Sequence, residues 1–252
     1  MILTITNQKG GVGKSTISQN IGAGLALKGY KTLLIDLDAQ ANLTLSTIKE
    51  KPNRTIYEAL KEQQITSDTI ISINKNLDLI PANINLSVAD LEFNQTGKEY
   101  KLRELLEPLE SKYKFIIIDT APALGILTIN ALTASNKVLI PIQADIYSLE
   151  AIRQLSQTIG TIKKYTNPGL DIIGLVLTRF NDRNVLTKEM FNSFVNVSKQ
   201  YNTKVLKTKI REAIAVKEAQ LKRMDIFSYS PKAKVTEDFS NLLKEILPTI
   251  KE

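Results

Sequence analysis

Short apolar runs and longer amphipathic stretches alternate along the chain. The runs have the length and the Ile, Leu and Val content of buried strands, and the stretches repeat apolar residues every three or four positions, as helices do. The predicted strands are Leu3–Thr6, Thr32–Ile35, Leu77–Ile80, Phe115–Ile118, Val138–Ile140, Ile172–Leu177 and, more weakly, Lys204–Leu206. The predicted helices include Ser15–Leu27, Lys101–Leu109 and Leu149–Tyr165.

This alternation predicts an α/β fold, in which a mostly parallel, twisted sheet carries helices on both faces. No internal repeat, low-complexity segment or Gly/Ser- or Pro-rich linker interrupts the 252 residues, so we expect one domain over residues 1–252. Parallel sheets of this kind bind ligands at the carboxyl ends of their strands. Candidate chemistry is therefore expected where an apolar run gives way to polar residues.

The first predicted strand leads into a glycine-rich loop, QKGGVGKST from Gln8 to Thr16, and a predicted helix follows it. This is the context of a phosphate-binding loop. Its glycines let several backbone N–H groups point at one anion, and the helix start adds its dipole. Lys14 can reach the β- and γ-phosphates, Ser15 can ligate Mg²⁺ and Thr16 can bond the next phosphate. The nucleotide-binding residues predicted here are Lys9, Gly10, Gly11, Val12, Gly13, Lys14, Ser15 and Thr16.

Two further predicted strands end in aspartates. Asp36 and Asp38 follow the second strand, and Asp119 follows the run that begins at Phe115. An aspartate that closes an apolar run is costly unless it reaches an open edge of the sheet. A phosphate loop needs such carboxylates to hold hydrated Mg²⁺ and to orient an attacking water. Each aspartate taken singly can also be a solvated strand end or a helix cap.

Together these segments resemble the deviant Walker A ATPases of the ParA/MinD superfamily. Gln8 stands where the ordinary loop has its first glycine, and an extra lysine, Lys9, follows it. DLDAQ from Asp36 is similar to the family's D-x-D-P-Q box, and DTAP from Asp119 to its D-x-P-P box, each with Ala in place of one Pro. The resemblance extends to about Phe239, which is almost the whole chain.

The resemblance implies roles for these residues. Lys9 would cross a dimer interface to the phosphates of the partner's ATP, and Asp38 would position the attacking water. Asp36 and Asp119 would hold Mg²⁺ through water, beside Ser15. The catalytic candidates are therefore Lys9, Lys14 and Asp38, with ATP and Mg²⁺ as the implied ligands. The family's adenine pocket falls near Thr178 and Arg211.

The composition limits the remaining chemistry. The chain has no Cys and no His, which excludes disulfides, thiolate metal sites, a Cys nucleophile and a His base. The first residues lack the basic and apolar regions of a signal peptide, and no stretch approaches the ~18 apolar residues of a membrane span. We therefore expect a cytoplasmic protein.

The net charge of +7 is unevenly distributed. Residues 1–150 carry 15 Lys and Arg against 16 Asp and Glu, whereas residues 151–252 carry 18 against 10. A basic excess confined to one half suggests a polyanionic partner, nucleic acid or an acidic membrane surface. Lysine-rich surfaces that only keep a protein in solution are an equally good explanation of the charge alone.

Two outputs of the superfamily remain open, ParA/Soj-like DNA partition and MinD-like membrane positioning. Branches that act through Cys are excluded, and the kinase branch has a C-terminal Tyr cluster that is missing after Tyr229. The C-terminal tail repeats apolar residues at helical spacing between Phe239 and Leu247, but without a basic rim, and Pro248 is expected to end its helix. We predict a helix packed on the sheet.

DNA binding needs basic residues on one face. Residues 204–223 hold seven Lys and Arg against two Glu, and the stretches at 179–183 and 229–234 resemble ParA segments that contact DNA. Ala215 stands where ParA-like proteins often have a basic residue. Any of these cations can instead be a solvated surface charge. The predicted DNA phosphate contacts are Arg183, Lys207, Lys209, Lys217, Lys232 and Lys234.

The sequence therefore predicts a ParA/Soj-like ATPase for plasmid or chromosome partition. It would dimerise around ATP, bind double-stranded DNA without sequence preference, associate with the nucleoid and leave DNA on hydrolysis. Hydrolysis would be slow alone, and the resemblance implies a ParB-like partner that stimulates it. The chain leaves no room before its loop for an N-terminal helix-turn-helix, and no membrane contact is expected. A MinD-like ATPase and a nucleotide-dependent scaffold with little turnover are the alternatives.

Overall fold

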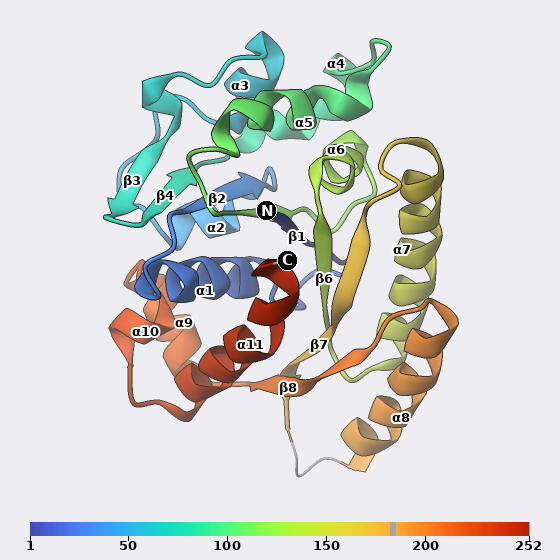
Figure 1. Cartoon of the computed structure of the whole chain (residues 1–252). Helices are drawn as coiled ribbons and strands as arrows, with labels where there is room; N and C mark the ends of the chain where they lie inside the picture. Colours follow the sequence, from blue (N-terminus) through green and yellow to red (C-terminus); the bar gives the residue numbers. More distant parts are fainter. Residues whose placement is uncertain (182–184, 252) are drawn as a thin grey trace.

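The computed structural model describes residues 1–181 and 185–251, and for residues 185–189 the backbone alone. Within this part of the chain, eight strands form one twisted sheet through the centre of the molecule (Figure 1). The strands are β1 (Ile2–Ile5), β2 (Thr32–Leu37), β3 (Ile71–Asn74), β4 (Leu77–Ile80), β5 (Phe115–Thr120), β6 (Lys137–Ile142), β7 (Asp171–Phe180) and β8 (Val205–Arg211). Their order is β3-β4-β2-β5-β1-β6-β7-β8, and every neighbouring pair is parallel except β3 with β4.

The α-helices connect these strands in the alternating manner that the pattern predicts. They are α1 (Lys14–Leu27), α2 (Asn42–Leu45), α3 (Ile56–Glu62), α4 (Ala89–Glu92), α5 (Lys101–Leu106), α6 (Ile126–Ala134), α7 (Ile146–Tyr165), α8 (Val185–Gln200), α9 (Ile214–Leu221), α10 (Ile226–Tyr229) and α11 (Lys234–Lys251). Short 3₁₀ turns are η1 (Ser67–Thr69), η2 (Ile84–Val88), η3 (Lys98–Tyr100) and η4 (Glu107–Leu109). The predicted α/β class, a mostly parallel sheet with helices on both faces, is confirmed.

The central strands bury both of their faces. Alternate residues of β1, β2 and β5 point to opposite sides, so Leu34 packs with α1 and α11 whereas Leu33 packs with α3 and α5. A third cluster, under α7 and α8, covers the face of β6 and β7 that adjoins α6. Because both faces are covered, these strands are continuous apolar runs, which is why they could be predicted from the sequence.

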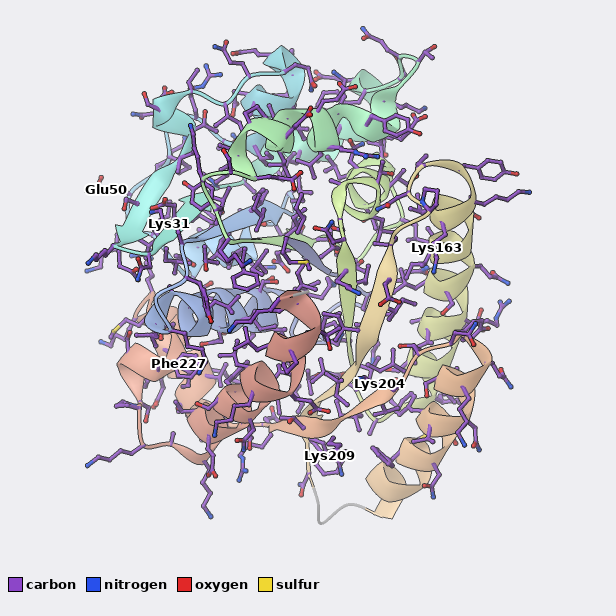
Figure 2. All side chains as sticks on the ribbon, viewed as in Figure 1. Lys31, Glu50, Lys163, Lys204, Lys209 and Phe227 are labelled. Atoms are coloured by element: carbon purple, nitrogen blue, oxygen red, sulfur yellow. The ribbon has the colours of Figure 1, made fainter. Side chains whose placement is uncertain are left out.

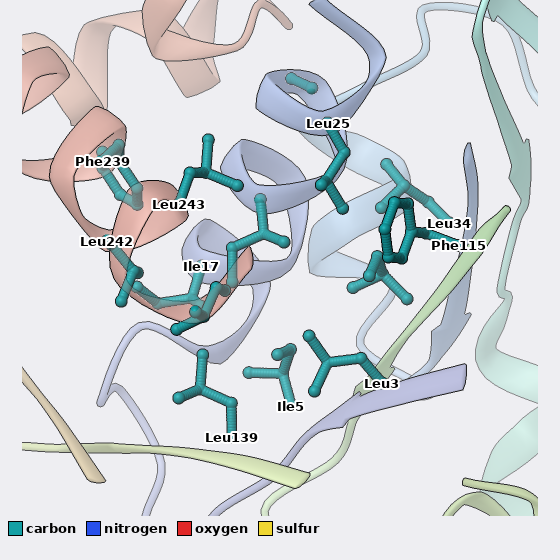
Figure 3. Close-up of a cluster of buried hydrophobic side chains, with 14 of the residues drawn as sticks. Leu3, Ile5, Ile17, Leu25, Leu34, Phe115, Leu139, Phe239, Leu242 and Leu243 are labelled. Atoms are coloured by element: carbon teal, nitrogen blue, oxygen red, sulfur yellow. The ribbon is translucent and has the colours of Figure 1, made fainter. Parts of the chain in front are cut away.

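Helix α1 lies between the sheet and α11. Figure 3 shows Leu242 and Leu243 of α11 beside Ile17 of α1, above Ile5 of β1. The approach is close at Gly24 of α1, where an added Cβ would lie 2.1 Å from the Leu243 side chain. α11 is therefore a core helix with its apolar face buried. No helix in the described part of the chain is long and apolar enough to cross a membrane.

The prediction missed one strand and placed two element ends wrongly. Strand β3 was missed, although the alternation of Ile71 and Ile73 with polar residues before an Asn-Lys-Asn turn is a hairpin signal. β8 runs to Arg211 rather than ending at Leu206. Its second half was missed because an edge strand mixes buried with exposed residues and has no continuous apolar run. α11 continues past Pro248 to Lys251. Pro248 removes a single helical bond, to the carbonyl of Lys244, and both residues lie on the exposed face of the helix, where the loss costs least.

Replacing a helical glycine by alanine tests the packing of α1 against α11. The same substitution should have opposite effects on stability at Gly160 and at Gly24. Gly160 of α7 is exposed with no atom within 4 Å of an added Cβ, so Gly160→Ala should raise the free energy of unfolding by about 0.5–1 kcal/mol. Gly24→Ala gains the same helix propensity, but overpacking against Leu243 costs about 1–3 kcal/mol, so its net effect should be destabilising. Urea unfolding of both variants measures this, and equal stabilisation of the two would contradict the packing.

Candidate nucleotide site

The predicted phosphate loop lies at the carboxyl end of β1, between the ends of β5 and β6. Gly11 and Gly13 have φ angles of 74° and 86°, a left-handed backbone that other residues rarely adopt. An added Cβ at either would meet no atom within 4 Å. Glycine is therefore required here by the backbone conformation and not by lack of space for a side chain. Between them Val12 is buried and anchors the loop, and α1 begins directly after Gly13.

A cavity of about 510 Å³ opens in front of this loop, within the usual size range of small-ligand sites. Its walls come from the loop, from the residues that follow β2, from the loop after β5, and from β7 and α9. The lining residues are Gly10, Gly11, Gly13, Lys14, Ser15, Thr16, Asp38, Gln40, Asn42, Leu45, Ser46, Pro122, Arg179 and Gln220. Loop residues and Asp38, which are 22 or more positions apart in the sequence, thus share one cavity.

Lys14 is held inside this cavity with only 6% of its surface exposed. Its ammonium donates a hydrogen bond of 3.2 Å to the carbonyl of Lys9. Burial lowers the pKa of Lys14, and the charges of Asp119 and Asp38 offset part of that effect. A buried cation that faces an anion-binding loop is suited to neutralise phosphate charge.

The ammonium of Lys9 has carboxylate and amide partners outside the lining of the cavity. It forms a salt bridge with Asp145 and donates to Gln143 Oε1 at 3.3 Å, both in the loop between β6 and α7. Asp145 also caps α7 by accepting from the backbone N–H of Ser148. Burial favours a higher pKa for Asp145, but the hydrogen bonds from Lys9 and Ser148 outweigh it and hold that pKa below its usual range.

Asp36 is fully buried and has protein donors on both carboxylate oxygens. The backbone N–H and the hydroxyl of Thr44 each donate to Oδ2 at 2.8 Å, and the backbone N–H of Asp38 donates to Oδ1 at 3.1 Å. Burial raises its pKa to about 6 in spite of these bonds. Asp36 therefore organises the segment from Asp38 to α2 that forms one wall of the cavity.

Asp119 is also fully buried, and it keeps one oxygen unused. Oδ1 accepts from Ser18 at 3.1 Å, whereas Oδ2 has no hydrogen-bond partner among the described residues. Burial, followed by the neighbouring charge of Asp36, raises the pKa of Asp119 to about 8, against the opposing effects of Ser15 and Lys14. A buried carboxylate oxygen without a donor is costly, and a hydrated cation between Asp119 and Ser15 would satisfy it.

An all-oxygen environment of this kind suits Mg²⁺. In the ranges that the structure describes, no group of three or more acidic, His or Cys residues could hold a metal by itself. A cation here would therefore be held by the phosphates of a nucleotide together with Ser15 and water, as Mg²⁺ usually is in nucleotide sites. The residues present fit that mode of binding.

Asp38 places its carboxylate at the cavity wall. It is 6% exposed, and its Oδ1 accepts from the backbone N–H of Gln40 at 2.9 Å. Its backbone carbonyl accepts from Ala41, whose φ of 52° turns the chain into α2. The carboxylate is thus fixed by the local turn at the wall of the cavity.

A smaller cavity of about 80 Å³ adjoins the first beside Thr178 and Arg211, where the adenine site is predicted. The Thr178 hydroxyl lies 2.8 Å from the carbonyl of Val12 and 3.0 Å from that of Ile142, so it ties the phosphate loop to β6 and β7. Arg211 forms a two-bond pair with Asp238, at 2.6 and 2.7 Å. Both residues therefore shape this cavity chiefly through bonds within the protein.

Sequence reasoning missed several residues of the site. Gln220 of α9 donates to the Thr16 hydroxyl at 2.9 Å, and Arg179 lines both cavities with a φ of 49°. Gln220 belongs to no motif of the sequence, and Arg179 lies in the stretch at 179–183 that resembles a DNA-contacting segment. Gln143 and Asp145 follow the apolar run of β6, so the rule that located Asp36 at a strand end could have found them.

The predicted DNA contacts have varied surroundings. The Lys209 ammonium lies 4.0 Å from the ring centre of Phe180, and the Lys217 ammonium is 3.5 Å from Glu212. Figure 2 shows Lys209 on β8 and Lys204 directly before that strand. Lys207, Lys232 and Lys234 are exposed. Arg183 lies outside the described residues.

Because Asp119 is buried, we predict that its ionisation lowers the stability of the nucleotide-free protein. Since its folded pKa is raised to about 8 from 3.8, its cost to stability grows as the pH rises between these values. Asp119→Asn removes the ionisation, so without nucleotide and Mg²⁺ its thermal midpoint at pH 8 should exceed that of the wild type by about 2–4 °C or more, with a smaller gap at pH 5. Equal midpoints at both pH values would contradict the raised pKa.

Known proteins of similar sequence extend over the whole chain. A family model described as "AAA domain" matches residues 1–172. The sporulation initiation inhibitor protein Soj of Bacillus subtilis is 40% identical over 249 residues, which cover 97% of each chain. The chromosome partitioning protein ParA of Myxococcus xanthus is 35% identical, over 98% of this chain and 87% of its own.

Solved structures agree with this fold. A putative plasmid partition protein of Borrelia burgdorferi bound to AMPPNP superimposes with a TM-score of 0.84 and 29% identity, over 98% of each chain. Cobyrinic acid a,c-diamide synthase of Mycobacterium smegmatis, with bound ATP analogue and magnesium, gives 0.86 and 29%, over 100% of this chain and 96% of its own. Because one fold carries different activities, the full-length sequence relatives decide the family. The chain belongs to the ParA/Soj family of P-loop partitioning ATPases.

Proposed function

We propose that this protein binds ATP with Mg²⁺, closes as a homodimer around two nucleotides and hydrolyses them slowly. The observation that carries the proposal is the arrangement of Lys14, Asp38 and Asp119 around a left-handed glycine loop. Lys14 is a buried cation with neighbouring carboxylates, and Asp119 has an oxygen without a donor among the described residues. Both features are costly in a folded protein unless an anion and a cation complete the site.

Each residue of the site then has a role in binding the nucleotide or in its hydrolysis. The backbone of Gly10–Gly13, the start of α1 and the Lys14 ammonium bind the phosphates. When bound, Mg²⁺ would supply positive charge to the phosphates. Ser15 and Asp119 hold its water shell, and Asp36 fixes the turn that carries Asp38. The carboxylate of Asp38 accepts a hydrogen bond from a water molecule and orients it for in-line attack.

Lys9 would complete the site of a second subunit. Its ammonium is not committed to its own phosphate cavity, since it pairs with Asp145 and Gln143 instead. The salt bridge is half-exposed, with about a quarter to a third of each side chain accessible, so exchanging Asp145 for a phosphate has a modest cost. This supports a role for Lys9 across a dimer interface.

The second half of the chain supports DNA as the partner. Residues 151–252 carry a charge of +8, and Lys207, Lys232 and Lys234 are exposed. Two subunits would double this surface, so binding without sequence preference would be much tighter in the ATP dimer and would place the protein on the nucleoid. A ParB-like partner that stimulates hydrolysis would then release it, as the similarity to Soj and ParA suggests. The buried apolar face of α11 argues against a membrane anchor.

Phosphate release tests the assigned roles in hydrolysis. Lys14→Ala should weaken ATP binding and abolish turnover, whereas Asp38→Ala should still bind ATP and lower turnover by about 100-fold or more, because water loses its positioning group. Arg153→Gln is the control, since this residue pairs with Glu150 on the exposed face of α7. Turnover that persists in both site variants would reject the assignment of these residues, whereas a wild type that binds ATP with little turnover would favour the scaffold alternative.

Binding to arbitrary double-stranded DNA tests the partition output. Binding should be tight and salt-sensitive with ATP or a non-hydrolysable analogue, and weak with ADP. Replacing Lys232 and Lys234 by Gln should flatten the salt dependence by about one phosphate contact per lysine, whereas the same changes at Lys163 and Lys164 of α7 should not. A filter-binding titration at two salt concentrations measures both. Sedimentation with anionic liposomes but not with DNA would favour the MinD-like alternative.

A further inference from the structure

The two cavities of the nucleotide site meet at a common border. Gly13, Thr16, Arg179 and Gln220 line both of them. The larger cavity contains Lys14 and Asp38, and the smaller one extends toward β8, α9 and α11. If the phosphates of a nucleotide fill the first cavity and its base enters the second, the border is the place of the α-phosphate and the ribose.

Arg179 is held at this border by both of its neighbours in the chain. Thr178 is buried and bonds the carbonyl of Val12, and Phe180 is buried and pairs with Arg211 across β7 and β8. Between these fixed points the backbone of Arg179 turns to a φ of 49°, in the left-handed region that residues with a Cβ avoid. Strain of this kind is kept where the surrounding structure imposes it, and it is frequent at ligand sites.

The charge of Arg179 has no counterpart in the described part of the protein. Arg179 is exposed, and among the described residues no carboxylate forms a salt bridge with it. Arg211, which also lines the smaller cavity, is already paired with Asp238. A guanidinium that has no carboxylate partner among the described residues and lies at the mouth of a phosphate site is a donor fork that matches phosphate oxygens.

We propose that Arg179 is a nucleotide-binding residue that contacts the α-phosphate at the border of the two cavities. The inference rests on the proposed ATP binding and adds a contact outside the phosphate loop. The α-phosphate is present in ATP and ADP alike, so Arg179 contributes equally to the affinity for both. It is assigned no part in orienting the attacking water, which is the role proposed for Asp38.

Calorimetric titration with ADP and with a non-hydrolysable ATP analogue, both with Mg²⁺, tests this contact. Arg179→Gln should weaken both nucleotides about tenfold, as expected for the loss of a charged hydrogen bond at a partly exposed site, and turnover at saturating ATP should stay within about twofold. Arg223→Gln is the matched control. Arg223 is also an exposed arginine with a left-handed backbone, at a φ of 57°, but it lines a different cavity, so its loss should leave both affinities within about twofold.

A glycine variant separates binding from folding. Arg179→Gly removes the guanidinium and relieves the left-handed strain, so the thermal midpoint of the nucleotide-free protein should not fall while both affinities drop as in Arg179→Gln. Unchanged affinities in both variants, with a wild type that binds, would overturn the inference alone. Weakened affinities that follow a loss of apo stability in both variants would also overturn it, by showing a structural role. A wild type that binds neither nucleotide would overturn the proposed function itself.

Discussion

Two carboxylates buried side by side constrain the rest of the site. Asp36 and Asp119 are register partners on β2 and β5, neither has exposed surface, and burial raises the pKa of both. Two adjacent anions without solvent are unstable unless the surroundings supply donors and cations. Thr44 supplies donors to Asp36, and Ser18 supplies one to Asp119. Among the described residues Oδ2 of Asp119 has no donor, so a carboxylate oxygen close to the phosphate loop is left for a ligand to satisfy.

Helix α1 transmits this constraint to the rest of the molecule. Its first residue, Lys14, lies among the carboxylates, while Ile17, Ile21 and Leu25 pack into the main core with α11. Gln220 of α9 donates to Thr16, the last residue of the phosphate loop, in the first turn of α1. The basic segments of α9 and α11 are therefore attached to the helix that carries the loop.

The sequence was sufficient to predict the elements that a short stretch of residues specifies. The apolar runs of β1, β2 and β5 are buried on both faces, and the glycine loop and Asp38 follow strand ends, so pattern and position agreed. β3 was missed because an edge strand is half polar and its run is short. The strand-end rule points to Asp145 but not to its pairing with Lys9, since the two are distant in sequence and meet only because β1 and β6 are neighbours.

Arg179 was beyond sequence reasoning for a different reason. Its segment resembles a DNA-binding stretch, and a basic residue in such a stretch is naturally assigned to DNA. The backbone conformation that sets it at the border of two cavities depends on the anchoring of Thr178 and Phe180, which involves β6, β8 and the phosphate loop together. A pattern within one short stretch of sequence cannot show that three separate segments meet around Arg179.

The same distinction applies to the basic half of the chain, where charge counts overestimate the surface that is free for a polyanion. Arg211 is neutralised by Asp238, Lys217 lies near Glu212, and Lys209 is stacked over aromatic rings of Phe180 and Phe191. An ion pair half in water is weak, so Lys217 can exchange its partner for a phosphate, whereas the two-bond pair of Arg211 is more costly to break. Lys232 and Lys234 are exposed at the start of α11 and have no such competition among the described side chains. A DNA surface on this protein would therefore centre on the start of α11, with the cations of α9 at its margin.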